Sequence, residues 1–137
     1  MCSIKYSKGY KYRIEGRYIS PESTGVYPPS DIVTKFITLR KSGILIIEDG
    51  YASDGASGTT FDTKSSMRGS FEHDALCQLV RERYLPDSWM HAINKRAHKV
   101  WLQDRMLKVR AWYWYRAIET DIAENIAKKP KKIYTAP

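Results

Sequence analysis

The residues best suited to chemistry lie in two neighbouring stretches in the middle of the chain. The first, residues 50–57 (GYASDGAS), is a loop of small residues with one carboxylate, Asp54. The second, residues 68–76 (RGSFEHDAL), opens a helix and carries the adjacent pair His73 and Asp74. Glycine has no Cβ, so such a loop lets backbone carbonyls approach a ligand closely. The pair adds a titratable base and a hard anionic ligand.

Together the two stretches predict a calcium-type site. A hard cation needs oxygen ligands, which Asp74 and the loop residues Asp54, Gly55 and Ser57 can supply. His73 can then activate a water as general base, while the cation polarises a carbonyl or phosphoryl group. The pattern indicates a candidate hydrolase of the esterase type with calcium as its cofactor.

Zinc is the other metal to weigh, because histidines and a cysteine recur at helical spacing. His73 and Cys77 are one turn apart, and His91 and His98 are two turns apart on a second helix. The set matches no recognised zinc-site spacing, so zinc is not expected. Cys2 and Cys77 lack CxxC spacing and favour free thiols, with a single disulfide left open.

The stretches also carry a resemblance to a known family. The runs YASDGASGTTF and MRGSFEHDALCQLVRE, followed by RAHKVWLQDRM and an aromatic helix, resemble small phage and prophage proteins known as domain of unknown function 1353. Gly50 to about Tyr115 carry the match. The resemblance implies a phage-encoded protein of the host cytoplasm or the virion, with other phage proteins or a host target as partners.

The same order is similar, more remotely, to bacterial secreted phospholipase A2. That resemblance implies His73 as general base, Asp74 as calcium ligand, residues 54–58 as calcium loop, and an anionic lipid or other ester as substrate. In that pattern an antiparallel helix brings a second aspartate to the histidine, and its place here is taken by His98. His98 is therefore the second candidate catalytic residue. A neutral histidine cannot stabilise an imidazolium as a carboxylate does, so an inactive scaffold is also open.

The elements that must position these residues form one α+β domain. Residues 1–49 favour a small antiparallel sheet of about three strands, residues 50–67 a long loop, residues 68–127 three helices, and residues 128–137 a basic tail. The expected strands are 10–19, 32–39 and 44–47, with a hairpin connection at 40–43. The expected helices start at Ser70, at a cap formed by Asp87 or Ser88, and at Ala111. Leu107 is counted in the apolar stripe of the second helix. The first two helices should form an antiparallel hairpin that carries the His–Asp pair.

Composition and charge bound the possible partners. The chain has 137 residues, is 42% hydrophobic and contains no apolar run long enough to span a bilayer, which predicts a soluble, unexported protein. A net charge of +8 favours anionic partners, and the one basic cluster spans residues 128–132. Residues 112–115 (WYWY) cannot all face one core from a helix. Core packing is the ordinary explanation, and a partner-binding or base-stacking surface is the alternative. The candidate binding residues are Trp112, Trp114 and Arg68.

Three functions remain open from the sequence. The first is a phage-encoded protein with a phospholipase A2-like His–Asp site. The second is a non-catalytic phage protein, such as a virion or tail component or a host-interaction factor. The third is nucleic-acid binding through the basic tail and the aromatic helix.

Overall fold

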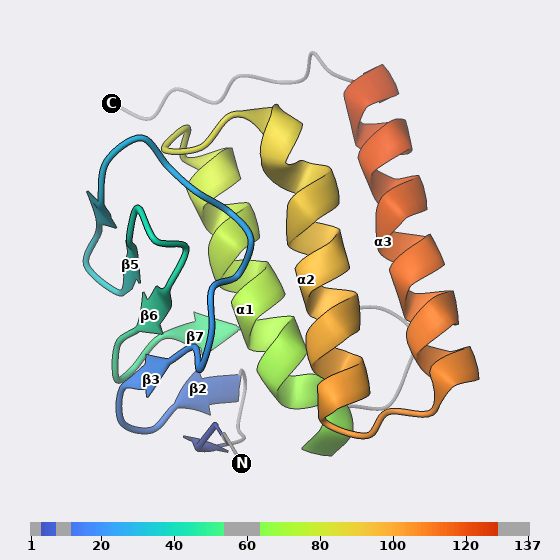
Figure 1. Cartoon of the computed structure of the whole chain (residues 1–137), viewed down its shortest axis with the longest axis horizontal. Coiled ribbons are helices and arrows are strands. Elements are labelled where there is room, and N and C mark those ends of the chain that lie inside the picture. Colours follow the sequence, from blue (N-terminus) through green and yellow to red (C-terminus); the bar gives the residue numbers. More distant parts are fainter. Residues whose placement is uncertain (1–3, 8–11, 54–63, 129–137) are drawn as a thin grey trace.

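The computed structural model describes residues 4–7, 12–53 and 64–128 (Figure 1). Its elements follow one another in a strand-rich half and a helical half. The strands are β1 (Tyr6–Ser7), β2 (Tyr12–Ile14), β3 (Tyr18–Ile19), β4 (Ile32–Val33), β5 (Ile37–Leu39), β6 (Leu45–Ile47) and β7 (Ala52–Ser53). The helices are α1 (Lys64–Arg81), the short 3₁₀ turn η1 (Asp87–Trp89), α2 (Met90–Gln103) and α3 (Lys108–Lys128). The α+β class is confirmed.

The strands form two antiparallel sheets among the described residues. One sheet has the order β1-β2-β7 and the other the order β3-β6-β5-β4. The expectation of about three strands was too low, because the strands are only two or three residues long and alternate with turns. The predicted turn at residues 40–43 is confirmed: Gly43 has φ +90°, and its N–H donates to the Arg40 carbonyl over 2.8 Å. Glycine adopts this left-handed backbone without steric cost.

The prediction of one strand over residues 32–39 was wrong. The segment folds back on itself as β4 and β5, with Ile32 opposite Leu39 and Val33 opposite Thr38. The Thr34 side chain holds this turn, because its Oγ1 accepts the Ile37 N–H at 3.0 Å. A threonine hydroxyl that bonds nearby backbone competes with the extended ladder, which β-propensity alone does not register.

Helix α1 begins at Lys64, six residues before the predicted start at Ser70. Strand β7 also falls within the stretch that was predicted to be a loop, and residues 54–63 of that stretch lie outside the described residues. The expected cap at Asp87 or Ser88 was wrong, since η1 leads directly into α2 and neither cap position makes a side-chain hydrogen bond. The predicted third helix is α3, which starts three residues before Ala111.

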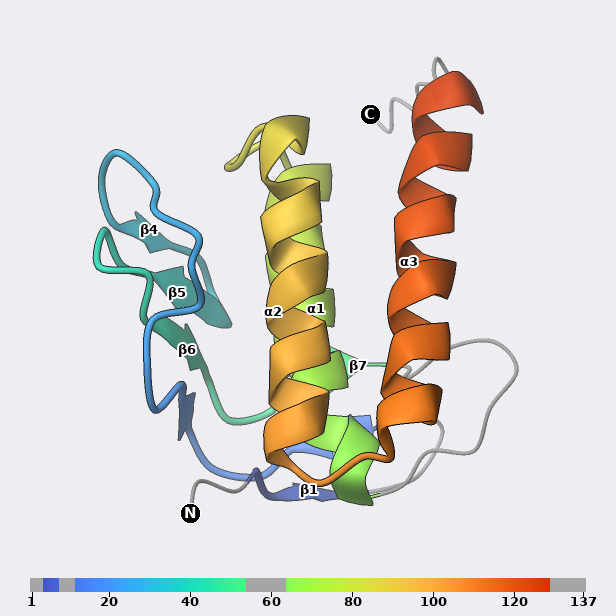
Figure 2. The same cartoon turned by 45° about the vertical axis from the view of Figure 1, so that its right-hand side comes forward.

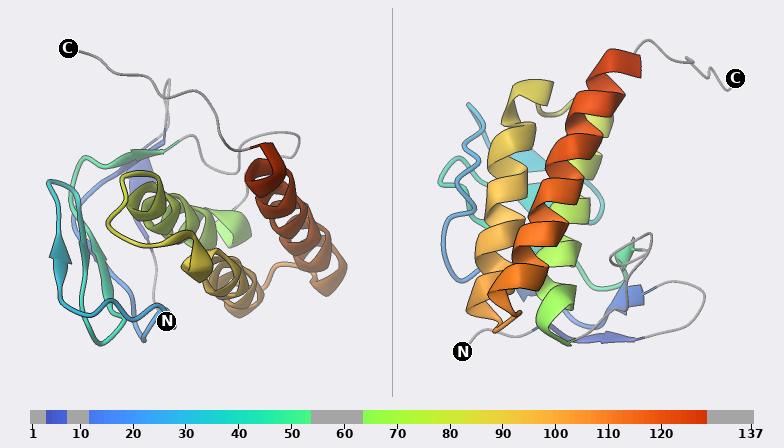
Figure 3. Two further views of the ribbon diagram at one scale, coloured as in Figure 1. Left: turned by 90° about the horizontal axis from the view of Figure 1, so that it is seen from above. Right: turned by 90° about the vertical axis from the view of Figure 1, so that its right-hand side faces the viewer.

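The chain builds three layers. Figure 2 shows the four-stranded sheet on one side, α1 and α2 in the middle and α3 on the far side, with β1 and β7 of the three-stranded sheet at the lower end of the helices. Figure 3 shows the four-stranded sheet, the α1–α2 pair and α3 in the same order from above. Helices α1 and α2 run antiparallel, as predicted, and make the largest interface between elements. None of the helices within the described part of the chain is both long and apolar enough to cross a bilayer.

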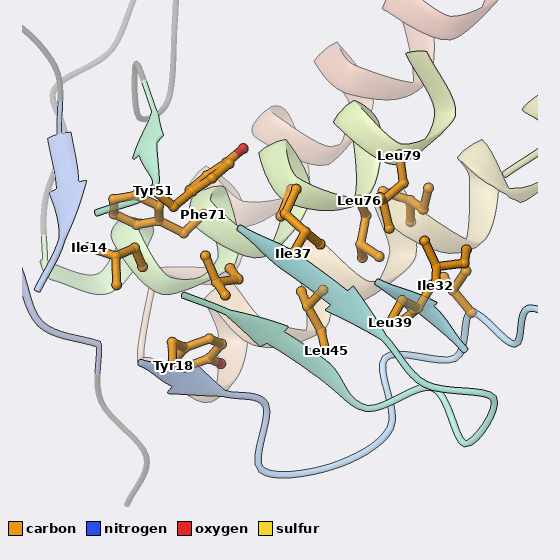
Figure 4. Close-up of a cluster of buried hydrophobic side chains, with 14 of the residues drawn as sticks. Ile14, Tyr18, Ile32, Ile37, Leu39, Leu45, Tyr51, Phe71, Leu76 and Leu79 are labelled. Atoms are coloured by element: carbon orange, nitrogen blue, oxygen red, sulfur yellow. The ribbon is translucent and has the colours of Figure 1, made fainter. Parts of the chain in front are cut away.

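The main core lies between the four-stranded sheet and α1. Figure 4 shows Phe71, Leu76 and Leu79 of α1 facing the inward side chains of the strands, which include Ile37 and Leu45. These side chains are fully buried. The apolar side chains that recur every three or four residues on α1, as predicted, therefore pack against the inward-facing side chains that alternate along the strands.

A smaller cluster joins α2 to α3. Trp101 packs edge-on against Trp114 with ring centroids 5.2 Å apart, and Ala97 and Ala111 are buried beside them. Leu107, which was expected in the stripe of the second helix, lies after that helix has ended and is 76% exposed.

Candidate functional site

The candidate site centres on His73, which is half-buried on α1 and faces α2. Its Nε2 lies 2.7 Å from Oδ1 of Asn94, a fully buried residue on α2. The Asn94 amide nitrogen donates to Glu119 over 2.9 Å, so its oxygen is the atom that faces the imidazole. Oδ1 can only accept, and Nε2 therefore carries the ring proton. In the neutral ring this leaves Nδ1 as the basic nitrogen.

Glu119 extends this chain of hydrogen bonds onto α3. Its carboxylate accepts from Asn94, from the Tyr115 hydroxyl at 3.0 Å and interacts with His91 Nδ1 at 2.6 Å. Partial burial raises the pKa of Glu119, but the hydrogen bonds from Asn94, Tyr115 and His91 outweigh it and lower the pKa overall. An ionised carboxylate thus anchors the asparagine that orients His73.

Cys77 lies one helical turn after His73. Its Sγ is 3.6 Å from Nε2 and 3.8 Å from Nδ1 of the imidazole. Burial, with the nearby charge of Asp74 as a second cause, raises the pKa of the Cys77 thiol to about 12. A thiol that stays protonated at neutral pH is a poor nucleophile, because the thiolate is the reactive form. Cys77 is therefore a neutral neighbour of the imidazole.

Asp74, half-buried on α1, interacts electrostatically with Tyr51 of the strand-rich half. Burial and the charge of Asp74 raise the pKa of Tyr51, a core residue whose ring packs edge-on against Phe71 (Figure 4). Tyr51 directly precedes β7, the strand that leads into residue 54. The charge of Asp74 thus acts on the residue that directly precedes this strand.

The other predicted cation ligands, Asp54, Gly55 and Ser57, lie outside the described residues. Within residues 4–7, 12–53 and 64–128, the structure shows no group of three or more His, Cys, Asp or Glu side chains that could hold a metal ion. Asp74 is the one predicted cation ligand that the structure describes. One carboxylate does not hold a hard cation by itself, since calcium takes six to eight oxygen ligands.

His98, the second candidate catalytic residue, lies apart from the bond to His73. Its ring stacks at a tilt on Tyr115, with centroids 5.0 Å apart. It also lines an open groove of about 1000 Å³ between residues 22–27, α2 and Tyr115. The residue on α2 that meets His73 is Asn94, one turn earlier.

Arg68, a candidate binding residue, is buried at the start of α1. Its guanidinium donates to both carboxylate oxygens of Asp104, to Tyr18 Oη at 3.0 Å and to Gln103 Oε1 at 2.9 Å. Burial lowers the pKa of Arg68, but Asp104 and Tyr18 raise it overall. These contacts place Arg68 in the scaffold between the sheet, α1 and the end of α2.

Trp112 and Trp114, the other candidate binding residues, face different ways. Trp112 is 52% exposed on the outer face of α3, whereas Trp114 is half-buried against Trp101. Arg110 stacks over Trp114 with its guanidinium carbon 4.5 Å from the ring centroid. Of these two tryptophans, Trp112 is the one that presents its ring to solvent.

Sequence reasoning missed Asn94, Glu119 and Glu72. Asn94 stands four residues before His98, so the two share a helix face, and that spacing was the available signal for the partner of His73. Glu119 had no comparable signal, because its contact depends on how α3 packs on α2. Glu72, next to His73, is fully buried, and a buried carboxylate is rare enough that sequence reasoning assigns it to the surface.

Comparison of the chain with protein-family models, with curated proteins and with solved structures gives no match. The two resemblances therefore stay predictions, and the case for a function depends on the geometry around His73.

Proposed function

We propose that this protein is an ester hydrolase in which His73 is the general base. The observation that carries the proposal is the 2.7 Å contact between His73 Nε2 and Asn94 Oδ1. Asn94 lies on the antiparallel helix α2, as the partner of the histidine does in the phospholipase A2 pattern. It is an amide instead of a carboxylate, and it lies one turn before His98, the position expected for that partner. The ionised Glu119 behind Asn94 supplies the negative charge that an asparagine lacks.

The residues act in a defined order in this proposal. Nδ1 of His73 removes a proton from a water as the water oxygen attacks the ester carbonyl carbon. Asn94 holds the imidazole in the tautomer whose Nδ1 carries no proton, and the Glu119 carboxylate favours the imidazolium that forms. The proton then passes from Nδ1 to the leaving alkoxide when the carbon–oxygen ester bond breaks.

Calcium is proposed as the cofactor, with Asp74 as its carboxylate ligand and residues 54–57 as the source of the remaining oxygens. The electrostatic effect of Asp74 on Tyr51, which precedes the strand that leads into residue 54, supports this part of the proposal. A bound cation polarises the ester carbonyl. Thermal melting of the protein with calcium, and with a chelator, tests it: wild type should be stabilised and Asp74→Asn should not. An unchanged melting curve for wild type contradicts the calcium site.

Hydrolysis of a fluorogenic phospholipid and of a p-nitrophenyl ester tests the base. His73→Gln should lower the rate by about 10²–10⁴-fold, the usual contribution of a general base. Asn94→Ala should lower it less, because the imidazole remains but loses its orientation. His98→Gln is the matched control, a histidine on the facing helix outside this chain of hydrogen bonds, and should keep the wild-type rate. Loss of activity in His98→Gln with retention in Asn94→Ala contradicts the proposed pairing.

A non-catalytic phage component is the second candidate function. The observation that favours it is the Cys77 sulfur, which lies within 4 Å of both imidazole nitrogens and partly covers the ring. In that case His73 only holds α1 against α2. His73→Gln would then lower the melting temperature, and wild type would show no hydrolysis of either ester.

A further inference from the structure

The outer face of α3 near its start carries an exposed aromatic stripe. Val109, Trp112 and Tyr113 recur at three- and four-residue spacing and are 68%, 52% and 62% exposed. Leu107, just before the helix, is 76% exposed. Figure 3 shows α3 at the outside of the helical layer, on the side away from the four-stranded sheet. We refer to Val109, Trp112 and Tyr113 as the α3 apolar face.

The α3 apolar face is not needed to hold α3 in place. The opposite side of the helix packs on α2 through the buried Ala111 and the half-buried Trp114 and Ile118. The inner face of α3 thus packs on α2, whereas the apolar side chains of the outer face lie in water. Apolar side chains grouped in this way on a surface mark an interaction site.

Basic side chains surround the α3 apolar face. They are Arg105, Lys108, Arg110 and Arg116, and residues 105–118 contain no aspartate or glutamate. Arg116 lies over the Trp112 ring at 5.7 Å, so charge and aromatic surface are interleaved. The nearest acidic residue before this segment, Asp104, is already bonded to Arg68.

We propose that the α3 apolar face inserts into the headgroup region of an anionic lipid bilayer. Tryptophan and tyrosine next to lysine and arginine are typical of helices that lie in a membrane interface. The basic residues attract anionic headgroups, and Val109 enters the acyl boundary beside the Trp112 ring. Aliphatic side chains this exposed have no role in stacking on bases, which favours lipid over nucleic acid. A second copy of the chain would bring two positive faces together, which disfavours a symmetric dimer.

This inference deepens the proposed function, since it places the ester substrate in a lipid surface, but it can be tested without catalysis. Sedimentation of the full chain with phosphatidylcholine vesicles, with and without phosphatidylglycerol, measures binding. Wild type should sediment with the anionic vesicles and remain in solution with the neutral ones. His73→Gln should bind like wild type, so a failed hydrolase assay leaves this result unaffected.

Two double variants, each with a matched control double variant elsewhere on the chain, test whether binding depends on the α3 apolar face itself. Val109→Ser with Trp112→Ser should abolish sedimentation, whereas Tyr27→Ser with Val33→Ser, two equally exposed apolar residues on the strand-rich side, should not. Lys108→Glu with Arg116→Glu should weaken binding by more than about fivefold per residue, because each charge is reversed. Lys35→Glu with Lys41→Glu, the same change in net charge elsewhere, should leave most of the binding.

Several outcomes would overturn the inference. Equal loss of binding in both charge-reversal pairs would mean that net charge alone attracts the vesicles. Binding to single-stranded DNA that depends on Trp112, without vesicle binding, would assign the face to nucleic acid. Concentration-dependent dimerisation that is lost in Val109→Ser with Trp112→Ser would assign it to a second copy.

Discussion

Nε of Arg96 on α2 lies 2.7 Å from Oε1 of Glu72 on α1, and both side chains are buried. The Tyr18 hydroxyl donates to the other Glu72 oxygen at 2.6 Å, so one carboxylate ties α1 to both α2 and the four-stranded sheet. Because Glu72 directly precedes His73, this bond fixes the rotation of α1 and hence the direction in which His73 points.

Replacing Glu72 should therefore be among the most destabilising single changes in the chain. Glu72→Ala leaves Arg96 buried without its main partner, and breaking a buried ion pair in this way costs about 3–5 kcal/mol. Tyr18→Phe, which removes the hydrogen bonds with Glu72 and Arg68 and keeps the ring, should cost less, about 1.5–3 kcal/mol. Urea unfolding of the two variants measures both values. Equal losses would mean that the charge pair is not the dominant contact.

Gly69→Ala should destabilise the protein although alanine favours helices by about 1 kcal/mol over glycine. A Cβ at position 69 would lie 2.7 Å from two atoms of the Trp101 indole, which is itself buried and cannot move aside. Overpacking of this kind costs about 1–3 kcal/mol, which exceeds the gain in propensity. Thermal melting shows whether Gly69→Ala is less stable than wild type, as expected. Combining Gly69→Ala with Trp101→Leu should remove most of the penalty relative to Trp101→Leu alone, and a fully additive pair would contradict the clash.

Cys77 should react slowly with thiol reagents while the protein is folded. Its pKa of about 12 leaves almost no thiolate at pH 8, and the thiolate is the reactive form. In a Cys2→Ser background, where only this thiol remains, iodoacetamide should modify the native protein at least about tenfold more slowly than the urea-unfolded protein. Fast labelling of the native protein at pH 8 would show that the thiol is not held neutral.

Glu22 should contribute to stability at neutral pH and lose that contribution in acid. Hydrogen bonds from Gln103 and Lys99, with a further one from Arg96, lower the pKa of Glu22 to about 2. The group is deprotonated in the native protein down to that pH, whereas it protonates near its ordinary value in the unfolded chain. Its contribution is therefore complete above about pH 4.5 and disappears as the pH falls toward 2.

The variant Glu22→Gln isolates this effect. It should be less stable than wild type at pH 7, and the difference in free energy of unfolding should shrink to nothing near pH 2. Glu82→Gln, which changes an exposed glutamate bonded to Gln78, is the matched control and should follow the wild-type curve. A constant difference between Glu22→Gln and wild type across this range would contradict the pKa assignment.

The sequence by itself determined the features that depend on neighbours along the chain. The apolar stripe of α1, the turn at Gly43 and the α1–α2 hairpin were all predictable, because periodicity and backbone preference act over a few residues. The same reasoning missed the turn at Thr34, where a side-chain hydroxyl captures a backbone N–H that an extended strand would have used.

Only the tertiary structure decided which side chain meets His73. Asn94 and His98 share a face of α2, so the sequence could not choose between them. The choice depends on the position of α2 along the axis of α1. Two long-range contacts set this position: the close approach of Gly69 to Trp101, and the bond between Glu72 and Arg96. Burial of Arg68 among Asp104, Tyr18 and Gln103 was likewise decided by packing, because its partners come from segments 35 to 50 residues away.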